Sequence, residues 1–348
     1  MNDAELETNQ TSPELPNSTV TDAQAESLID SDTLHKASTQ ISALKNNVQR
    51  LLIGQNDVVE QVIIAFLAGG HVLLEGVPGL GKTLLIRALA KSIDLDYKRV
   101  QFTPDLMPAD VTGHSMLDMA SGQFSLRKGP AFTHLLLADE INRAPAKTQA
   151  ALLEVMQEYQ ITIDGKSMPL ETPFMVLATQ NPIDNEGTYP LPEAELDRFM
   201  LKVLVSYPEH QDEIKLTKLN TENQTGIVNA SIQSVLSKQD VLELKALVSK
   251  VLIDDNVVDY AVGLVRATRE WDGIVHGAGI RASIALVQAA KVKALCEGQS
   301  FVTPDHIKAM LLPVLRHRII LSAEREISGS SAEQVLSEII QQVAAPRQ

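Results

Sequence analysis

Residues 76–83 of this 348-residue chain read GVPGLGKT, and this short run constrains the fold more than any other feature of the sequence. Gly76, four further residues and then Gly81-Lys82-Thr83 match the phosphate-binding P-loop pattern G-x-x-x-x-G-K-[ST]. The glycines let the backbone curl so that successive N–H groups point at phosphate oxygens. In this pattern Lys82 reaches the β- and γ-phosphates, and the Thr83 hydroxyl is a Mg²⁺ ligand. The run therefore predicts a site for a nucleoside triphosphate and its metal.

The residues on either side of this loop place it between a strand and a helix. His71–Glu75 is a short apolar run of the kind found in buried strands. Thr83–Ser92 carries apolar residues at helical spacing, and a helix that starts there directs its N-terminus at the bound phosphates. The local context therefore supports a phosphate site over a glycine-rich turn without a ligand.

The same alternation of strand and helix extends over residues 35–205 and predicts an α/β fold. Several of the strands are continuous apolar runs, which is typical of parallel strands buried on both faces. We therefore expect a five-stranded parallel sheet between helices. The predicted strands are His71–Glu75, Tyr97–Phe102, His134–Asp139, Phe174–Thr179 and Met200–Val205. One addition interrupts the alternation: Ile161–Ile163, Asp164-Gly165 and Lys166–Met168 predict a β-hairpin with a type I′ turn.

Strand signals stop after Val205, and residues 206–348 predict a second, all-helical domain. Thr303 and Ser331 are suitable helix N-caps, and Pro304 suits the first helical position. The predicted helices are Glu209–Leu219, Lys238–Leu252, Asp255–Trp271, Arg281–Cys296, Thr303–Leu315 and Ser331–Ala344.

Residues 1–34 differ in composition from the rest of the chain. They hold eight acidic residues and no Lys or Arg, so they account for much of the net charge of −14. Such a segment buries too little apolar area to offset its ordering entropy, and we expect an acidic, disordered tail. The acidic balance disfavours nucleic acid as a partner. The single cysteine, Cys296, fits a reducing compartment, and we expect a cytoplasmic protein without a membrane span.

Two carboxylates follow the third predicted strand. Leu135–Ala138 is an apolar run that ends in Asp139 and Glu140, about 50 residues beyond the P-loop. Asp139 suits a Mg²⁺ ligand in the Walker B role, through metal-bound water, and Glu140 suits the base that orients or deprotonates the attacking water. The alternative is a charge pair that only complements the dipole of a helix N-terminus. Together with the P-loop, the pair indicates hydrolysis as well as binding.

Three further polar residues occupy positions from which they can complete such a site. Asn181 ends the next strand, where its amide can hold the attacking water; alternatively, Asn-Pro only starts a turn. Arg198 precedes the last strand and suits an arginine finger, unless it pairs with nearby carboxylates as a surface ion pair. Arg281 opens a helix of the second domain, where the helix dipole disfavours a cation unless an anion lies nearby. From there it can reach nucleotide across the interdomain cleft.

In this order the motifs resemble the AAA+ ATPases, and more narrowly the MoxR family. The resemblance covers roughly residues 40–320 and is dense in motifs. It lies in the strings QNDVVEQVIIAFLAGGHVLLEGVPGLGKT, RVQFTPDLMPADVTG, KGPAFTHLLLADEINRAPAKTQAALLEVMQE, FMVLATQNPIDNEGTYPLPEAELDRF and GIRAS. One departure is that Gly279 and Ile280 stand where the family usually has Ser-Pro.

The resemblance implies a role for each matching position. Lys82 and Thr83 belong to Walker A, Asp139 and Glu140 to Walker B, and Asn181 to sensor 1. By the same resemblance, Arg198 is the arginine finger, Arg281 is sensor 2, residues 110–129 form the helix-2 insert and residues 161–168 the pre-sensor-1 insertion. The implied nucleotide contacts are Ile53, Gly54, Gln55, Gly76, Val77, Pro78, Gly79, Leu80, Gly81, Lys82, Thr83, Leu84 and Arg281, and the implied metal ligands are Thr83 and Asp139.

The resemblance also implies a function that the residues alone do not reveal. Proteins of this family form hexameric rings, bind ATP or ADP with Mg²⁺, and act as chaperone-like ATPases with von Willebrand factor A domain proteins. They assemble or activate other complexes, often by inserting a metal or cofactor. Two alternatives share the same core: a motor subunit similar to that of magnesium chelatase, and a nucleic-acid translocase or helicase subunit. Few Lys and Arg residues lie on the predicted hairpin, which disfavours the translocase.

Overall fold

The computed structural model describes residues 29–77, 79–119, 122–182, 188–222 and 232–346. Residues 1–28 of the predicted tail lie outside these described residues. Helix α1 (Ser31–Gln49) begins before residue 34, the expected end of the tail, so residues 31–34 are helical and not disordered as predicted. The Asp30 carboxylate accepts a hydrogen bond from the Thr33 N–H and caps the helix, and Leu34 packs against the hydrophobic core.

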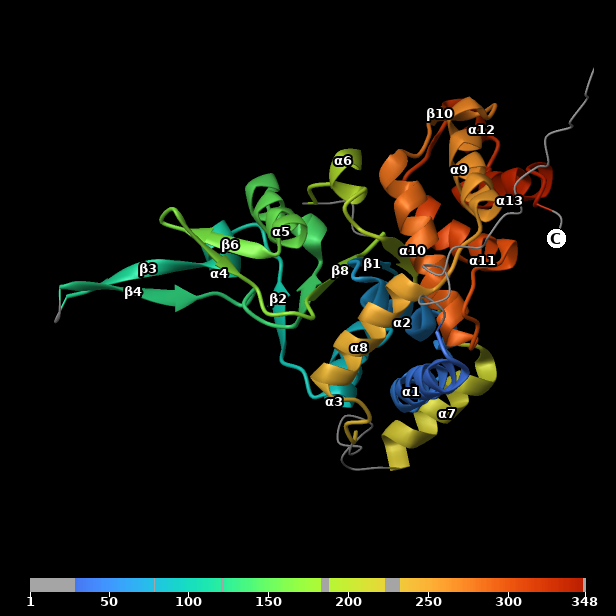
Figure 1. Ribbon diagram of the computed structural model, residues 1–348. Coiled ribbons are helices and arrows are strands. Elements are labelled where there is room, and N and C mark those ends of the chain that lie inside the picture. The colour runs from blue at the N-terminus through green and yellow to red at the C-terminus, as the bar shows by residue number, and fades with distance from the viewer. Residues whose placement is uncertain (1–28, 78, 120–121, 183–187, 223–231, 347–348) are drawn as a thin grey trace, which may run out of the picture.

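Five parallel strands form the central sheet in the order β2-β5-β8-β1-β9 (Figure 1). The predicted α/β fold is confirmed, and the ends of every predicted strand lie within one residue of the observed ends. The apolar runs gave a strong signal because the middle strands are buried along most of their length. The strands are β1 (Val72–Glu75), β2 (Tyr97–Gln101), β5 (Leu135–Asp139), β8 (Met175–Gln180) and β9 (Leu201–Leu204).

Helices cover both faces of this sheet. Leu73 and Leu136 belong to one hydrophobic cluster, whereas their neighbours Leu74 and Leu135 belong to another. Successive side chains of a strand point to opposite faces, so both faces of the sheet are buried. The helices of the α/β core are α1, α2 (Asn56–Ala68), α3 (Lys82–Ile93), α4 (Pro108–Thr112), η2 (Ile141–Arg143), α5 (Ala146–Glu158) and α6 (Glu193–Leu196).

The predicted hairpin is present as β6 (Gln160–Ile163) and β7 (Lys166–Pro169). Its two turn residues, Asp164 and Gly165, have φ angles of +50° and +74°. Positive φ at both central positions defines a type I′ turn, whose twist matches that of the flanking strands. The Asp-Gly pair was therefore a sufficient sequence signal for this element.

A second hairpin, which we call the ribbon, was not predicted as strands. It consists of β3 (Gly113–Asp118) and β4 (Gln123–Lys128) within the predicted helix-2 insert, and it projects away from the body of the molecule (Figure 1). All residues of β4 are exposed, so this strand lacks the buried face that produces a clear alternation. At the base of the ribbon, Gly113 (φ +97°) lies so close to Gly129 that neither position has room for a side chain.

The C-terminal part of the chain is a helical lid, as predicted. It also contains a short antiparallel pair of strands, β10 (Ile274–His276) and β11 (Ile320–Leu321), which are too short to give a sequence pattern. The lid helices are α7 (His210–Glu222), α8 (Lys238–Lys250), α9 (Asp255–Glu270), α10 (Ile280–Cys296), α11 (Pro304–Leu315), α12 (Ala323–Ile327) and α13 (Ala332–Gln342).

The lid packs firmly on the α/β core. Helix α10 contacts α1 and α2, and helix α11 contacts the edge strand β9. One continuous hydrophobic cluster includes Leu44 of α1, Val62 of α2 and Leu286 of α10, so apolar burial extends from core to lid. Among the described residues, no helix combines the length and the apolar character needed to cross a membrane.

Candidate functional site

The P-loop connects the carboxyl end of β1 to the N-terminus of α3. Gly79 and Gly81 have φ angles of +88° and +82°, a conformation that side-chain-bearing residues rarely adopt. A Cβ atom on Gly76 would lie 2.4 Å from the carbonyl oxygen of Val205, so glycine is also required there by space. Helix α3 begins at Lys82, and its free N–H groups face the loop. The predicted residue Pro78 lies outside the described residues.

A cavity of about 450 Å³ lies beside this loop. Its walls come from the P-loop, the start of α3 and the carboxyl ends of β2, β5 and β8, the edge at which parallel α/β sheets bind ligands. The structure therefore brings together the Walker A, Walker B and sensor 1 positions predicted from sequence. The lining residues are Gly79, Gly81, Lys82, Thr83, Leu84, Arg87, Arg99, Gln101, Asp139, Glu140, Thr179 and Asn181.

Lys82 lies at the bottom of the P-loop, and its ammonium group donates a hydrogen bond to the Gly76 carbonyl oxygen. Burial lowers the pKa of Lys82, while the nearby carboxylates of Asp139 and Glu140 act in the opposite direction. Among the residues that line the cavity, the three cations Lys82, Arg87 and Arg99 outnumber the two carboxylates Asp139 and Glu140, so the net charge is positive and suits phosphate binding.

Asp139 is the last residue of β5, and its carboxylate accepts hydrogen bonds from two side chains. Its Oδ1 accepts a hydrogen bond of 2.6 Å from the Thr179 hydroxyl. Its Oδ2 accepts two hydrogen bonds from the Arg99 guanidinium, at 2.6 Å from Nη2 and 3.1 Å from Nε. Asp139 is thus fixed in place from both sides by neighbouring strands of the sheet.

Glu140 has an unusual backbone conformation for its residue type, with a φ angle of +57°. Its N–H donates to the Thr179 hydroxyl oxygen at 2.9 Å, which holds the turn in this conformation. Its carboxylate Oε2 accepts a hydrogen bond of 2.7 Å from Gln101 and pairs with Arg143 Nε at 3.1 Å. A strained residue retained at the wall of a cavity is typical of a functional position.

Asn181 lies one residue beyond β8, is almost fully buried and lines the cavity. The hydroxyl of Thr179 joins Asp139 and Glu140 from the same strand. The end of β8 therefore contributes both a fixing group for the two carboxylates and an amide that faces the cavity.

Sequence reasoning missed four residues of this cavity: Arg87, Arg99, Gln101 and Thr179. Arg99 and Gln101 are two positions apart on β2, so they share a face of the strand. The register places Gln101 opposite Asp139, which brings both polar side chains to the Walker B carboxylates. Polar residues at alternate positions near the end of a strand were the available signal; its meaning depended on knowing that β2 and β5 are neighbours.

The predicted adenine segment lies next to the P-loop. Gln55 donates a hydrogen bond of 2.7 Å to the Ser206 carbonyl oxygen, and Gly54 has a φ of +78°. A Cβ atom on Gly81 would lie 3.6 Å from the Leu52 side chain, so the chain just before this segment lies beside the P-loop. Ile53, Gly54 and Gln55 are not among the residues that line the cavity of about 450 Å³.

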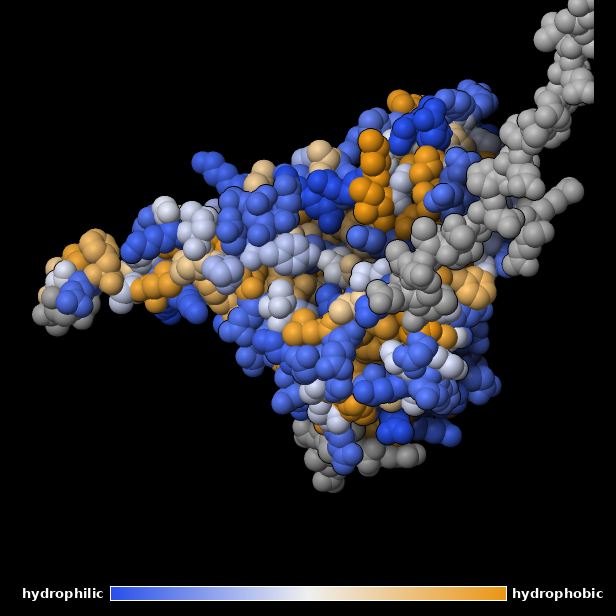
Figure 2. All heavy atoms as spheres, viewed as in Figure 1, coloured by the Kyte–Doolittle hydropathy of each residue, from blue (hydrophilic) through white to orange (hydrophobic). Residues whose placement is uncertain are grey.

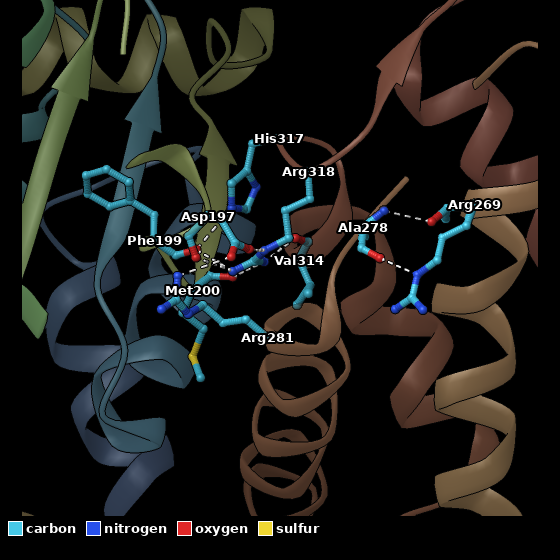
Figure 3. Close-up of polar contacts among 10 residues, drawn as sticks. Asp197, Phe199, Met200, Arg269, Ala278, Arg281, Val314, His317 and Arg318 are labelled. Carbon is cyan, nitrogen blue, oxygen red and sulfur yellow. Dashed lines mark hydrogen bonds and ion pairs between the residues drawn. The ribbon is translucent and has the colours of Figure 1, made fainter. Parts of the chain in front are cut away.

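The two predicted arginines lie at the opposite edge of the sheet. Arg198 donates to the Leu153 carbonyl oxygen at 3.1 Å. Arg281 pairs with Asp197 at 3.2 Å, as Figure 3 shows. Both line a separate cavity of about 190 Å³ at the amino end of the strands, where the Met200 N–H meets the His71 carbonyl oxygen. The expectation that Arg281 reaches nucleotide across its own interdomain cleft is therefore not met in the described structure.

The donor set of the larger cavity fits a nucleotide with Mg²⁺. Mg²⁺ prefers oxygen ligands and takes only one or two from protein, the others coming from water and phosphate. The hydroxyl of Thr83 and the carboxylate of Asp139 offer such oxygens on the same cavity. Within the described ranges, no three His, Cys, Asp or Glu side chains form a self-sufficient metal site, so an ion here would depend on the nucleotide phosphates. The glycine turn and the start of α3 supply phosphate donors.

Comparison with known proteins agrees with this architecture. Residues 71–201 match the ATPase family associated with various cellular activities (AAA), and residues 266–339 match the AAA lid domain. The YeaC protein of Bacillus subtilis is 43% identical over 302 residues, which is 87% of this chain and 93% of YeaC.

Two further relatives carry descriptions of their own. Chaperone MoxR1 of Mycobacterium tuberculosis is 40% identical over 311 residues, covering 86% of this chain and 81% of MoxR1. The crystal structure of a candidate ATPase from Cytophaga hutchinsonii superposes with a TM-score of 0.84 at 40% identity, over 93% of this chain and 98% of that one. Motifs, fold and relatives together place this chain in the MoxR family of AAA+ ATPases.

Proposed function

We propose that this ATPase hydrolyses ATP with Mg²⁺ in the cavity beside the P-loop. Thr83 and Asp139 would hold the metal, which when bound neutralises phosphate charge and polarises the terminal phosphoryl group. The backbone N–H groups of the loop and the ammonium group of Lys82 bind the phosphates. These assignments are supported by the common cavity that all of these groups line.

Glu140 is the residue proposed to accept the proton of the attacking water. Its carboxylate lies at the cavity wall and is held by Gln101 and Arg143, so it must leave at least one of these partners to act as a base. The Asn181 amide, one residue beyond the adjacent strand β8, is proposed to orient the same water, and its place in the lining of the cavity supports this role. Replacing Glu140 by Gln retains the shape of the site but removes the base.

We further propose that the protein works as a homo-oligomeric ring, with six subunits as the expected number. One observation carries this proposal: Arg198 and Arg281 share the edge of the sheet opposite their own P-loop. We call the edge that carries Arg198 and Arg281 the arginine edge. A head-to-tail ring brings the arginine edge of one subunit against the nucleotide cavity of the next. Both arginines then stabilise negative charge on the neighbour's terminal phosphate.

Mixed oligomers test this arrangement. Arg198→Ala and Lys82→Ala subunits are each expected to be inactive alone, but a ring that contains both places an intact Arg198 beside an intact P-loop. Steady-state phosphate release should therefore partly recover when the two variants are coexpressed. As a control, Glu140→Gln coexpressed with Lys82→Ala should show no recovery, because both changes damage the same pocket. Absence of recovery in the first mixture contradicts action between subunits.

The work done with this energy is proposed to be chaperone-like remodelling of partner protein complexes in the cytoplasm. The name of the M. tuberculosis relative, Chaperone MoxR1, supports this role, and the expected partner is a von Willebrand factor A domain protein. The ribbon supports a protein target over nucleic acid: Figure 2 shows apolar residues along it, and Leu117, Phe124 and Leu126 on one of its faces are exposed. The net charge of −14 points the same way.

Trapping with nucleotide tests the remodelling role. Tagged Glu140→Gln protein should retain ATP and hold its target, so a defined complex should copurify in ATP and dissociate in ADP. Lys82→Ala provides the matched control because it lacks the nucleotide contact. Mass spectrometry identifies the retained proteins, and remodelling is then measured with the purified target and wild-type ATPase. Stimulation of phosphate release by DNA or RNA, lost at high salt, would favour the translocase alternative instead.

A further inference from the structure

Arg99 is a residue of the nucleotide cavity for which neither the motifs nor the relatives provide a role. Its guanidinium donates twice to Asp139 Oδ2, at 2.6 Å and 3.1 Å. The other carboxylate oxygen, Oδ1, is taken by Thr179. The cation of Arg99 therefore occupies Oδ2, the oxygen of Asp139 that the Thr179 hydroxyl leaves available to a metal and its water.

The position of Arg99 allows this contact to be exchanged. Its side chain is 49% exposed, whereas that of Asp139 is 17% exposed, so the arginine is the partner with freedom to move. Arg99 lines the same cavity as Gly79, Gly81 and Lys82 of the P-loop. A guanidinium released from Asp139 thus faces the phosphate-binding groups, and its planar fork matches phosphate oxygens.

From this geometry we propose that Arg99 takes the place of the metal at Asp139 while no nucleotide is bound, and passes to the nucleotide phosphates when Mg²⁺ binds. In the empty site its charge keeps Asp139 and Glu140 from repelling an incoming anion. In the loaded site Mg²⁺ neutralises Asp139, and Arg99 becomes a phosphate donor within its own subunit. Arg99 is then the residue that couples metal affinity to nucleotide affinity. This inference rests on the Mg²⁺ site proposed above.

The movement of Arg99 away from Asp139 also affects Glu140, the proposed base. Arg99 Nη2 donates to Gln101 Oε1 at 3.0 Å, and the amide nitrogen of Gln101 donates to Glu140. When Arg99 leaves Asp139, Gln101 loses the donor that orients its amide group. The contact that retains Glu140 is weakened by the same event, so arrival of the metal and release of the carboxylate are linked.

Binding of mant-AMP-PNP, a fluorescent ATP analogue that is not hydrolysed, measures this coupling without relying on activity. The dissociation constant is determined in excess MgCl₂ and in EDTA for wild type, Arg99→Gln and Arg99→Lys. Lys98→Gln is the matched control, because it removes the same charge from an exposed neighbour whose side chain faces the other side of β2. Thermal unfolding of each variant establishes that it is folded.

The expected result is a larger metal dependence in Arg99→Gln. Without metal, Asp139 is no longer neutralised and the analogue binds more weakly. With Mg²⁺, Arg99→Gln loses a phosphate contact but also loses the cation that competes with the metal for Asp139, so the net loss is smaller. The ratio of the two constants should rise by about tenfold, a coupling of the size common between linked sites. Arg99→Lys keeps the charge but loses the planar guanidinium, so its ratio should lie between those of wild type and Arg99→Gln. The ratio of Lys98→Gln should match that of wild type.

An unchanged ratio of the two constants in Arg99→Gln would overturn the inference. If both constants rise by the same factor, Arg99 is a purely structural bridge between β2 and β5. If neither constant changes, Arg99 has no part in nucleotide binding. A wild type whose binding is independent of Mg²⁺ points instead to failure of the proposed metal site, and Thr83→Ala should then leave binding unchanged as well.

Discussion

At the scale of single residues, His71 shows how burial fixes a protonation state. Its Nδ1 accepts a hydrogen bond of 3.0 Å from the Val176 N–H, so the other ring nitrogen carries the proton and donates to the Met156 carbonyl oxygen at 2.9 Å. Burial lowers the pKa of His71 from 6.5 to about 4, and the hydrogen bond to Met156 offsets only part of this. A second proton would place the Nδ1 hydrogen directly against the Val176 N–H hydrogen.

This arrangement predicts acid sensitivity. Between pH 6.5 and about 4 the unfolded state binds a proton at His71 that the folded state does not, so stability rises with pH in this window and is lost as pH falls. The complete contribution is about 3 kcal/mol. Guanidinium unfolding at several pH values should show a shallower pH dependence in His71→Gln than in wild type. Replacing the exposed His35 by Gln is the control, and an unchanged slope in His71→Gln contradicts the prediction.

At the scale of elements, the start of α10 decides where Arg281 points. Gly279 occupies the N-cap position without a side-chain cap, and the exposed Ile280 is the first helical residue. The family usually has Ser-Pro at these two positions. The helix nevertheless begins ahead of Arg281, because Ala282, Ala285 and Leu286 bury one face of α10 against the core. Packing replaces the missing local signals.

Ile280→Pro should therefore stabilise the protein. Proline presets φ at the first helical position, and the N–H it removes has no partner within the helix. The expected gain is about 0.5 kcal/mol, mainly from the lower entropy of the unfolded chain. Thermal unfolding provides the measurement, with Ile280→Ala as the control that removes the same side chain without fixing φ. A lower melting temperature than that of Ile280→Ala would show that this position does not have first-turn geometry.

At the scale of the whole molecule, one buried arginine joins lid to core. Arg318, which follows α11, donates to Asp197 Oδ1 at 2.7 Å and to the carbonyl oxygens of Phe199 at 2.7 Å and Met200 at 3.0 Å (Figure 3). Burial lowers the pKa of Arg318, and its contacts with Asp197 oppose this effect. Because Asp197 also pairs with Arg281, one carboxylate connects the lid to the arginine edge.

Removing the Asp197 carboxylate should destabilise the contact between the lid and the α/β core. Asp197→Asn leaves the Arg318 charge buried without an anionic partner, and a buried pair broken in this way costs about 3 kcal/mol. In denaturant unfolding, the double variant Asp197→Asn with Arg318→Leu should be less destabilised than the sum of the single variants, because no unpaired charge remains. Strictly additive losses would mean that the two residues do not depend on each other.

Sequence alone determined the sheet, the P-loop and the Walker B carboxylates. These features depend on local rules: apolar runs produce buried strands, glycines permit the tight turn, and strand ends collect polar side chains at one edge. The type I′ turn at Asp164-Gly165 was predictable for the same reason. Each of these signals lies within a few consecutive residues, and no information on neighbours in space was needed to interpret it.

Only the tertiary structure decided which groups meet. The sequence does not state that β2 lies beside β5, so it did not reveal that Arg99 and Gln101 hold Asp139 and Glu140. The exposed strands of the ribbon lack the burial that creates a pattern, so they were missed. The position of Arg281 follows from how the lid packs on the core, because long-range apolar burial, and not any local motif, directs it to the edge opposite its own P-loop.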